Sequence, residues 1–172
     1  MPLRKLAALA ACAAFAAAAA ADEWKQYRYP DEGFAVEFPA APTAKELPSS
    51  PQRVRGIQRT ARDDAGTEYL GQATLYQPGV RAKYPADVLL RAAIDGLRNA
   101  GKCALRDARD FPFPGAVARE VILDRCGEGN TARARFVLLG DWLYLVLAIG
   151  RPGIERSADT ARLLDSFTVI AK

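Results

Sequence analysis

The chain has 172 residues, with 24 Lys and Arg residues against 20 Asp and Glu residues and no histidine. This length is that of one domain with a substantial core. Without histidine, Ser-His-Asp and Cys-His nucleophile systems and the usual zinc sites are excluded, and acid–base catalysis would have to use carboxylates, lysine or tyrosine.

The N-terminus has the pattern of a secretory signal peptide. Arg4 and Lys5 provide a positively charged start, and residues 6–21 carry no charged side chain. This run ends in three alanines followed by two acids, which fits cleavage after Ala21. A membrane span needs about 20 clearly apolar residues, and most of this shorter run is alanine. We therefore predict a signal peptide at 1–21, one globular α/β domain at 22–172, and export to the periplasm.

Cys12 gives an alternative mode of processing. Residues 9–12 match the pattern of a bacterial lipoprotein signal, in which a lipidated Cys12 would tether the protein to a membrane. Only six uncharged residues precede Cys12, whereas the apolar region of a signal peptide has roughly 7–15. Cleavage after Ala21 is therefore favoured, and membrane association is expected only if Cys12 is lipidated.

Cleavage changes the charge balance of the chain. It removes Arg4 and Lys5, so 22 basic residues remain against 20 acidic ones and the net charge falls from +4 to +2. A nucleic-acid-binding domain usually has a clustered basic footprint. We therefore expect no nucleic-acid partner.

Three strands are predicted in the first half of the domain. Residues 34–38 alternate large apolar side chains with Ala and Glu, which indicates a strand with one buried face. Four prolines predict an extended loop over 39–52. Residues 54–62 and 68–76 are expected to form a hairpin around the turn at 63–67.

Residues 85–100 form the clearest predicted helix. Their apolar side chains recur at helical spacing, with charged residues on the opposite side. Pro85 suits the first helical position and Gly101 the C-terminal cap. Gly96 weakens the helix because glycine disfavours helical backbone.

The second half predicts four consecutive strands, a second helix and a last short strand. The strand over 142–149 is apolar at every position, so it should be central and covered on both faces. The fold class is α+β, a largely antiparallel sheet covered by two helices, in the order βββ-α-ββββ-α-β. The predicted ranges are strands at 103–110, 116–125, 131–139 and 142–149, a helix at 154–166 and a strand at 167–170.

The two cysteines that remain after cleavage predict a disulfide. Export places Cys103 and Cys126 in an oxidising compartment, where an even number of cysteines indicates pairing. In a hairpin centred on Pro114 and Gly115, Cys103 precedes the turn by as many residues as Cys126 follows it. The two residues would then face each other across the ladder, unless Pro112 and Pro114 shift the register. A structural bond is favoured over a redox switch, because neither cysteine lies in an activating motif.

Five arginines on two predicted strands raise the question of an anion-binding face. Arg53, Arg55 and Arg59 lie on one strand, and Arg133 and Arg135 on another. If these strands were neighbours, they would form a cationic stripe for an anionic partner or a phospholipid surface. A solvated face or a charged edge that prevents aggregation is the favoured interpretation.

Two further groups have structural explanations. Trp24, Tyr27 and Tyr29 precede the first predicted strand, where such aromatics usually pin a terminal segment onto the core rather than line a groove. The acidic turn at 63–68 lacks the spacing of a calcium loop, which favours a solvated hairpin turn.

Three segments resemble a known family. They read YPDEGFAVEFPAAP at 29–42, LLGDWLYLVLAIG at 138–150 and ADTARLLDSFTVI at 158–170. They are similar to segments of small exported bacterial proteins with the α/β/α sandwich of the PsbP-like family. The resemblance implies that fold over most of the mature chain, and roles in assembly or stabilisation. It implies no particular functional residue.

These observations favour a non-catalytic periplasmic domain that binds or stabilises an unidentified protein or small ligand. No cofactor or metal site is expected. The alternatives are a carboxylate-based hydrolase, which needs two acids converging in a cleft with at least one perturbed pKa, and the lipoprotein tethered through Cys12.

Mass spectrometry of the mature protein distinguishes the two modes of processing. We expect a free N-terminus at Asp22, because the run before Ala21 has the length and the small residues that signal peptidase requires. An acylated N-terminal Cys12 would instead establish the tethered form.

Overall fold

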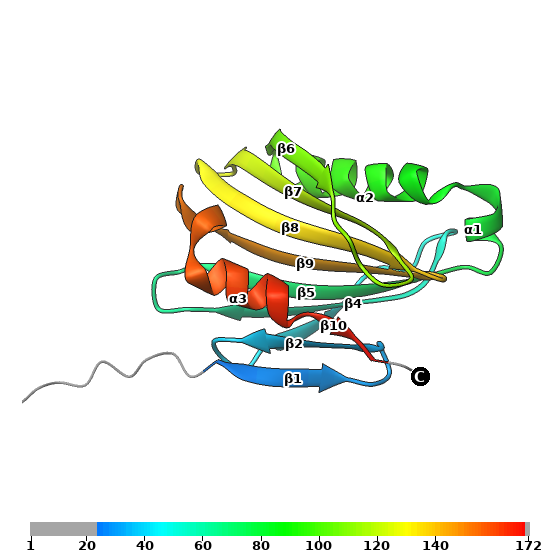
Figure 1. The fold of residues 1–172 in the computed structure, drawn as a ribbon, viewed down its shortest axis with the longest axis horizontal. Helices are drawn as coiled ribbons and strands as arrows, with labels where there is room; N and C mark the ends of the chain where they lie inside the picture. Colours follow the sequence, from blue (N-terminus) through cyan, green and yellow to red (C-terminus); the bar gives the residue numbers. More distant parts are fainter. Residues whose placement is uncertain (1–23, 171–172) are drawn as a thin grey trace, which may run out of the picture.

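The computed structural model describes residues 24–170 as two antiparallel sheets with helices packed on them (Figure 1). Ala21 and Cys12 lie outside the described residues. The elements are β1 (Lys25–Tyr29), β2 (Phe34–Phe38), β3 (Thr43–Glu46), β4 (Arg53–Arg62), β5 (Glu68–Tyr76), α1 (Val80–Lys83), α2 (Ala86–Gly101), β6 (Ala104–Asp110), β7 (Val117–Cys126), β8 (Asn130–Leu139), β9 (Trp142–Gly150), the 3₁₀ helix η1 (Ile154–Arg156), α3 (Ala158–Ser166) and β10 (Thr168–Val169).

The large sheet has seven strands in the order β3-β4-β5-β9-β8-β7-β6. The fourth of these strands is β9, so the prediction that residues 142–149 form a central strand is confirmed. Its side chains alternate between two separate clusters, with Tyr144 and Val146 in one and Leu143 and Leu145 in the other. Each face of β9 therefore needs its own covering layer.

Different elements cover the two faces of the large sheet (Figure 1). On one face lies α2, whose buried side chains Leu89, Leu90 and Ile94 pack on the cluster that includes Leu143. On the other face lie α3, with Leu163 buried, and the small sheet β1-β2-β10. The predicted α+β sandwich is confirmed, and its second layer contains a small sheet as well as a helix.

Three local predictions are wrong. Residues 25–29 form a strand, because the aromatic segment pairs with β2. The proline-rich loop contains β3, which pairs with β4 over 43–46, a stretch between Pro42 and Pro48 without proline. The predicted helix at 154–166 is divided at Ser157, whose hydroxyl accepts a hydrogen bond from the Thr160 N–H and so begins α3.

The β6–β7 hairpin has the predicted register near its turn. Arg109 faces Glu120 and Asp110 faces Arg119, as a turn centred on Pro114 and Gly115 requires. An irregularity at Arg106 then shifts the pairing by one residue. β7 has an irregularity of its own between Leu123 and Cys126, where Arg125 adopts a positive φ. The two cysteines therefore lie side by side just beyond the last ladder pair, Ala104 with Asp124, rather than as a pair within the ladder.

A disulfide nevertheless joins Cys103 to Cys126, with their Cα atoms 4.2 Å apart. Cys103 lies between the end of α2 and the start of β6, and Cys126 is the buried last residue of β7. The predicted helix cap is displaced by one residue, because Lys102 rather than Gly101 adopts the left-handed conformation. A side chain at Gly101 would place its Cβ 2.7 Å from the Cys103 sulfur, so glycine makes room for the bond.

Replacing both cysteines by alanine should lower the free energy of unfolding by about 3 kcal/mol, because the bond restricts the unfolded chain. Urea unfolding of the oxidised protein and of the Cys103→Ala/Cys126→Ala variant measures the difference. Dithiothreitol should destabilise the wild-type protein by a similar amount and leave the variant unchanged. Equal stabilities of the oxidised protein and the variant would contradict a stabilising role.

Candidate functional site

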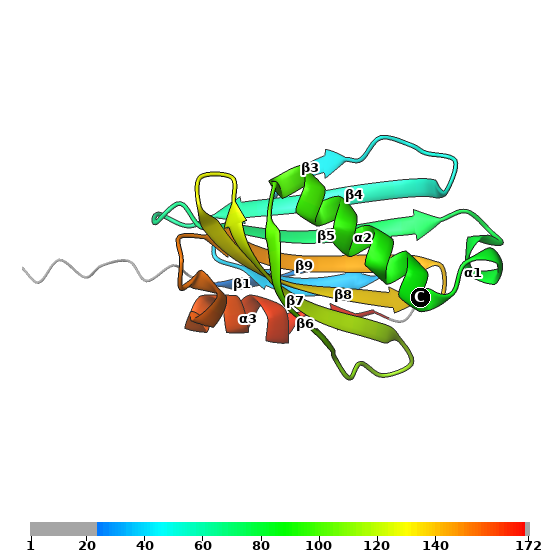
Figure 2. The ribbon, with the colours of Figure 1, turned by 90° about the horizontal axis from the view of Figure 1, so that it is seen from above.

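An apolar groove of about 550 Å³ lies on the α2 side of the large sheet. It exists because α2 packs on β7 and β8 and leaves the strands on the other side of β9 partly uncovered. Figure 2 shows α2 crossing over this face of the sheet. The floor of the groove comes from three neighbouring strands and consists of Leu70, Phe136, Leu143, Leu145 and Leu147.

The helix wall of the groove is made mainly of small residues. Ala93, Gly96, Leu97 and Ala100 of α2 line it. A Cβ atom added at Gly96 would meet nothing within 4 Å. Gly96 is an exposed residue at the edge of this wall, so close packing does not require a glycine there and a side chain would add to the wall.

The opposite wall is formed by the segment between β3 and β4, where Leu47, Ser50 and Gln52 line the groove, and by Arg53 at the start of β4. The Leu47 N–H donates to the Gly56 carbonyl oxygen, which ties the start of this segment to β4. This backbone hydrogen bond therefore attaches the first residue of the wall to the sheet.

Polar side chains lie along one side of the floor. Gln58 donates to Thr60, and Gln72 donates to Thr74, in each case to the threonine two residues further along the same strand. Glu68, at one end of the groove, forms an ion pair with Arg62 at 2.7 Å. These polar groups are bonded within the protein, and the floor beside them is apolar.

The arginines of the two predicted strands do not form one stripe. The strands β5 and β9 separate β4 from β8, so the arginines belong to two groups. Arg55 and Arg59 both bind Glu32, whose side chain is 5% exposed. The interpretation as a solvated face is wrong for Arg135, whose side chain is 9% exposed.

The second group surrounds Glu120, whose side chain is 1% exposed. It accepts hydrogen bonds from Arg109, from Arg133 at 2.9 Å and from Arg135 at 2.7 Å. Burial raises the pKa of Glu120, but the bonds from the three arginines outweigh burial and hold this pKa below its usual value. Arg135 also pairs with Asp165, so the cluster is largely neutralised within the protein.

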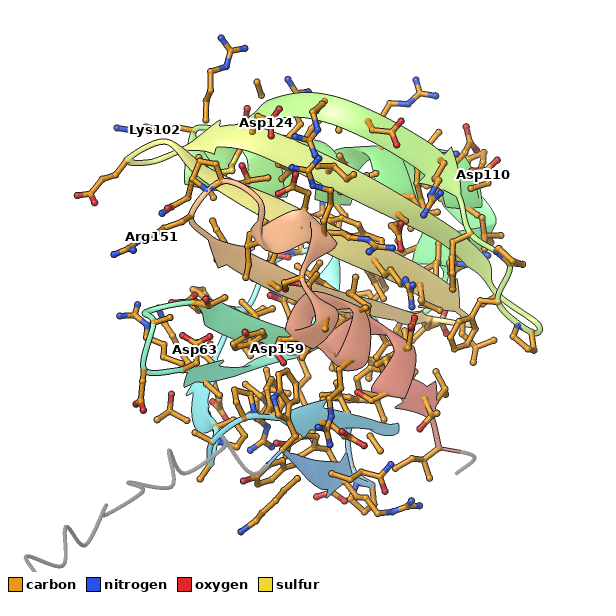
Figure 3. All side chains as sticks on the ribbon, turned by 60° about the vertical axis from the view of Figure 1, so that its left-hand side comes forward. Asp63, Lys102, Asp110, Asp124, Arg151 and Asp159 are labelled. Atoms are coloured by element: carbon orange, nitrogen blue, oxygen red, sulfur yellow. A yellow bond between two sulfur atoms is a disulfide. The ribbon has the colours of Figure 1, made fainter. Side chains whose placement is uncertain are left out.

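Neighbouring carboxylates follow the same pattern. Glu155, with its side chain 3% exposed, binds Arg106, and its pKa is also lowered because hydrogen bonds outweigh burial. Asp110 and Asp124, at opposite ends of the β6–β7 hairpin (Figure 3), pair with Arg119 and Arg106. Carboxylates with lowered pKa values stay ionised at neutral pH, so neither Glu120 nor Glu155 suits the role of a general acid.

The acidic turn and the N-terminal aromatics have the structural roles favoured by the sequence. Asp63, in the β4–β5 turn (Figure 3), accepts hydrogen bonds from the Thr67 N–H and the Tyr69 hydroxyl. Trp24 packs edge-on against Tyr69, with ring centroids 5.2 Å apart. Tyr29 lies beneath the Arg59 guanidinium. Within residues 24–170, no group of three or more acidic or cysteine residues is placed to hold a metal ion.

None of the helices between Trp24 and Ile170 has the length and apolarity that crossing a membrane requires.

Solved structures show which fold this is. No protein-family model and no curated protein matches the chain. The solution structure of cyanobacterial PsbP (CyanoP) from Synechocystis sp. PCC 6803 is similar with a TM-score of 0.59 and 12% identity, covering 94% of this chain and 98% of that one. The chain therefore has a PsbP-like fold, as the three sequence segments predicted.

Two other structures are more distant. Protein PA94 of unknown function from Pseudomonas aeruginosa has a TM-score of 0.44 and 16% identity, covering 87% of this chain and 97% of that one. A structure from Bacteroides thetaiotaomicron has a TM-score of 0.41 and 11% identity, covering 86% and 49%. Similarities this low carry no information about function.

Sequence reasoning did not identify the groove, although two signals pointed to it. Gly96 interrupts an otherwise good helix, and the structure places it in the groove wall. In β5, Gln72 and Thr74 occupy alternate positions with Leu70, on the face that a fully covering helix would have made apolar. Gln72 and Thr74 therefore mark the part of the sheet face that α2 does not cover.

Replacing Glu120 by glutamine should cost about 3–5 kcal/mol of stability, because three arginines would lose the charge that compensates them. Chemical unfolding as a function of pH tests this. Because the pKa of Glu120 is lowered by folding, its contribution is complete above the ordinary value of 4.5 and is lost as the pH falls through the lowered pKa. The difference from wild type should therefore be constant near neutral pH and shrink in acid.

The matched control is Asp165→Asn. This side chain is 67% exposed and also pairs with Arg135, so its loss should cost less than about 1 kcal/mol. A cost for Glu120→Gln no larger than that of this control would show that the buried cluster is not important for stability.

Proposed function

We propose that this chain is an exported, non-catalytic domain that binds a small, elongated apolar ligand. The observation that carries the proposal is the groove beside α2, whose volume of about 550 Å³ lies in the range of small-molecule sites. Its leucine floor and small-residue wall suit an apolar guest. The signal-peptide pattern predicted at 1–21 and the disulfide support export, because disulfide bonds persist in oxidising compartments.

The two arginine clusters are less suitable binding sites than the groove, because their arginines are already paired with carboxylates of the protein. Arg55 and Arg59 share Glu32, while Arg133 and Arg135 share Glu120. A guest at either cluster would have to compete with a carboxylate that is already bound. The groove requires no such exchange.

The hydrolase alternative needs two acids that converge in a cleft. Among the described residues that line the groove, Glu68 alone carries a carboxyl group, and it is paired with Arg62. The composition of the groove therefore favours binding over hydrolysis.

A neutral dye tests the groove as a binding site. N-phenyl-1-naphthylamine should fluoresce on binding the wild-type protein, and Gly96→Leu should weaken its affinity at least tenfold by filling the open space. The matched control, Gly96→Ala, adds only a methyl group. It should bind within about threefold of wild type and gain up to about 1 kcal/mol of stability from the better helix former.

Thermal unfolding checks that both variants fold. Absence of dye binding to the wild-type protein, or equal binding by the folded Gly96→Leu variant, would overturn the proposal.

A further inference from the structure

The two ends of the groove differ in charge. At one end Glu68 pairs with Arg62 and faces Ile149 across the sheet. At the other end Arg53 lies opposite Tyr76 in the β4–β5 ladder. Both Arg53 and Tyr76 line the groove, so this end is cationic and carries a phenol.

A second arginine, Arg81, acts on the same end. It belongs to the short helix α1, which begins four residues after β5 ends at Tyr76. Burial raises the pKa of the Tyr76 hydroxyl, and the positive charges of Arg53 and Arg81 act in the opposite direction. Arg53 is the one of these two arginines that lines the groove beside Tyr76, whereas Arg81 is a neighbouring positive charge on α1.

These two arginines lack the carboxylates that bind Arg55, Arg59, Arg133 and Arg135. Nε of Arg53 and Nη1 of Arg81 are buried and have no hydrogen-bond partner. Arg53 donates to the Pro48 carbonyl oxygen, and within residues 24–170 no acidic side chain forms an ion pair with Arg53 or Arg81. Arg59 and Arg133 also have an unsatisfied Nε, but each of them is paired with a glutamate.

A buried N–H without a partner is unfavourable, and an anionic oxygen is the strongest acceptor for a guanidinium group. The end of the groove near Tyr76 therefore has unused capacity for one anionic group.

The floor that leads away from this end is long and apolar. Leu143 lies near Tyr76, and Leu145, Leu147 and Ile149 follow at alternate positions of β9. At about 3.3 Å per residue, this row extends for about 20 Å. Such a shape suits an unbranched chain.

The polar side chains of the floor disfavour a peptide. A bound peptide brings an N–H and a carbonyl with every residue, and each needs a partner once it is buried. Gln58 and Gln72 each use one amide N–H on Thr60 and Thr74, and the rest of the floor is apolar, so the floor offers fewer partners than a peptide backbone needs. A guest with one polar end and an apolar remainder leaves fewer groups unsatisfied.

We propose that the groove binds a long-chain carboxylate, with its alkyl chain on the leucine floor and its carboxylate at Arg53 beside Tyr76. This inference rests on the proposed function and adds the chemical class of the ligand. Guanidinium groups suit a carboxylate because their paired N–H groups match its two oxygens.

Displacement of bound N-phenyl-1-naphthylamine tests the proposal with two ligands of equal chain length. Tetradecanoate should displace the dye at a concentration at least tenfold lower than tetradecanol. In Arg53→Gln this preference should fall to threefold or less, and in the double variant Arg53→Gln/Arg81→Gln to twofold or less, while the affinity for tetradecanol stays within twofold of wild type. Arg156→Gln, which alters an 83% exposed side chain on η1, should keep the full preference.

The outcomes separate the two proposals. Equal displacement by acid and alcohol, or a preference that persists in the double variant, overturns the carboxylate site while the apolar groove stands. If the wild-type protein binds neither the dye nor either ligand, the groove function fails and the carboxylate site fails with it.

Discussion

The arrangement of this domain depends on a strand that cannot have an exposed face. Every residue of β9 from Trp142 to Ile149 is apolar, and the residues from Leu143 to Ala148 are all buried. Burying one leucine or valine side chain contributes about 1.5–3 kcal/mol, so exposing either face of β9 would cost several times that amount. The strand is stable only at the centre of a sheet with a layer on each side, and the positions of α2, α3 and the small sheet follow from this requirement.

The two layers meet the requirement to different extents. A helix is about 10–12 Å wide with its side chains, whereas seven strands about 4.8 Å apart span about 29 Å. The helix α2 therefore covers only part of its face, and the groove is the remainder. The other face is closed more completely, because the small sheet adds Phe34 and Phe38, and arginines enclose Glu120 where the apolar cover ends.

The main features of the fold could be predicted from the sequence, because they arise from local periodicity. Short segments of sequence were enough to predict three of these features. They are the amphipathic stripe of α2, the central position of β9 and the hairpin register next to Gly115. The strands β1 and β3 were missed, because these short edge strands are mostly exposed and lack an alternating apolar pattern of their own, and pairing with the next strand stabilises them. The separation of the two arginine groups depends on the order of the strands, and the incomplete cover by α2 depends on the width of the sheet. No short segment of sequence indicates either strand order or sheet width.

Gly96 has a consequence for how this protein can diverge. A Cβ atom at this position meets nothing within 4 Å, and any residue other than proline or glycine would favour the helix more. Alanine can therefore replace glycine in the groove wall without a steric penalty, and larger residues at the same codon change how much of the wall is filled. Under the proposed function, this single position gives related chains a short mutational path toward narrower ligand preferences, and its first step, to alanine, also favours the helix.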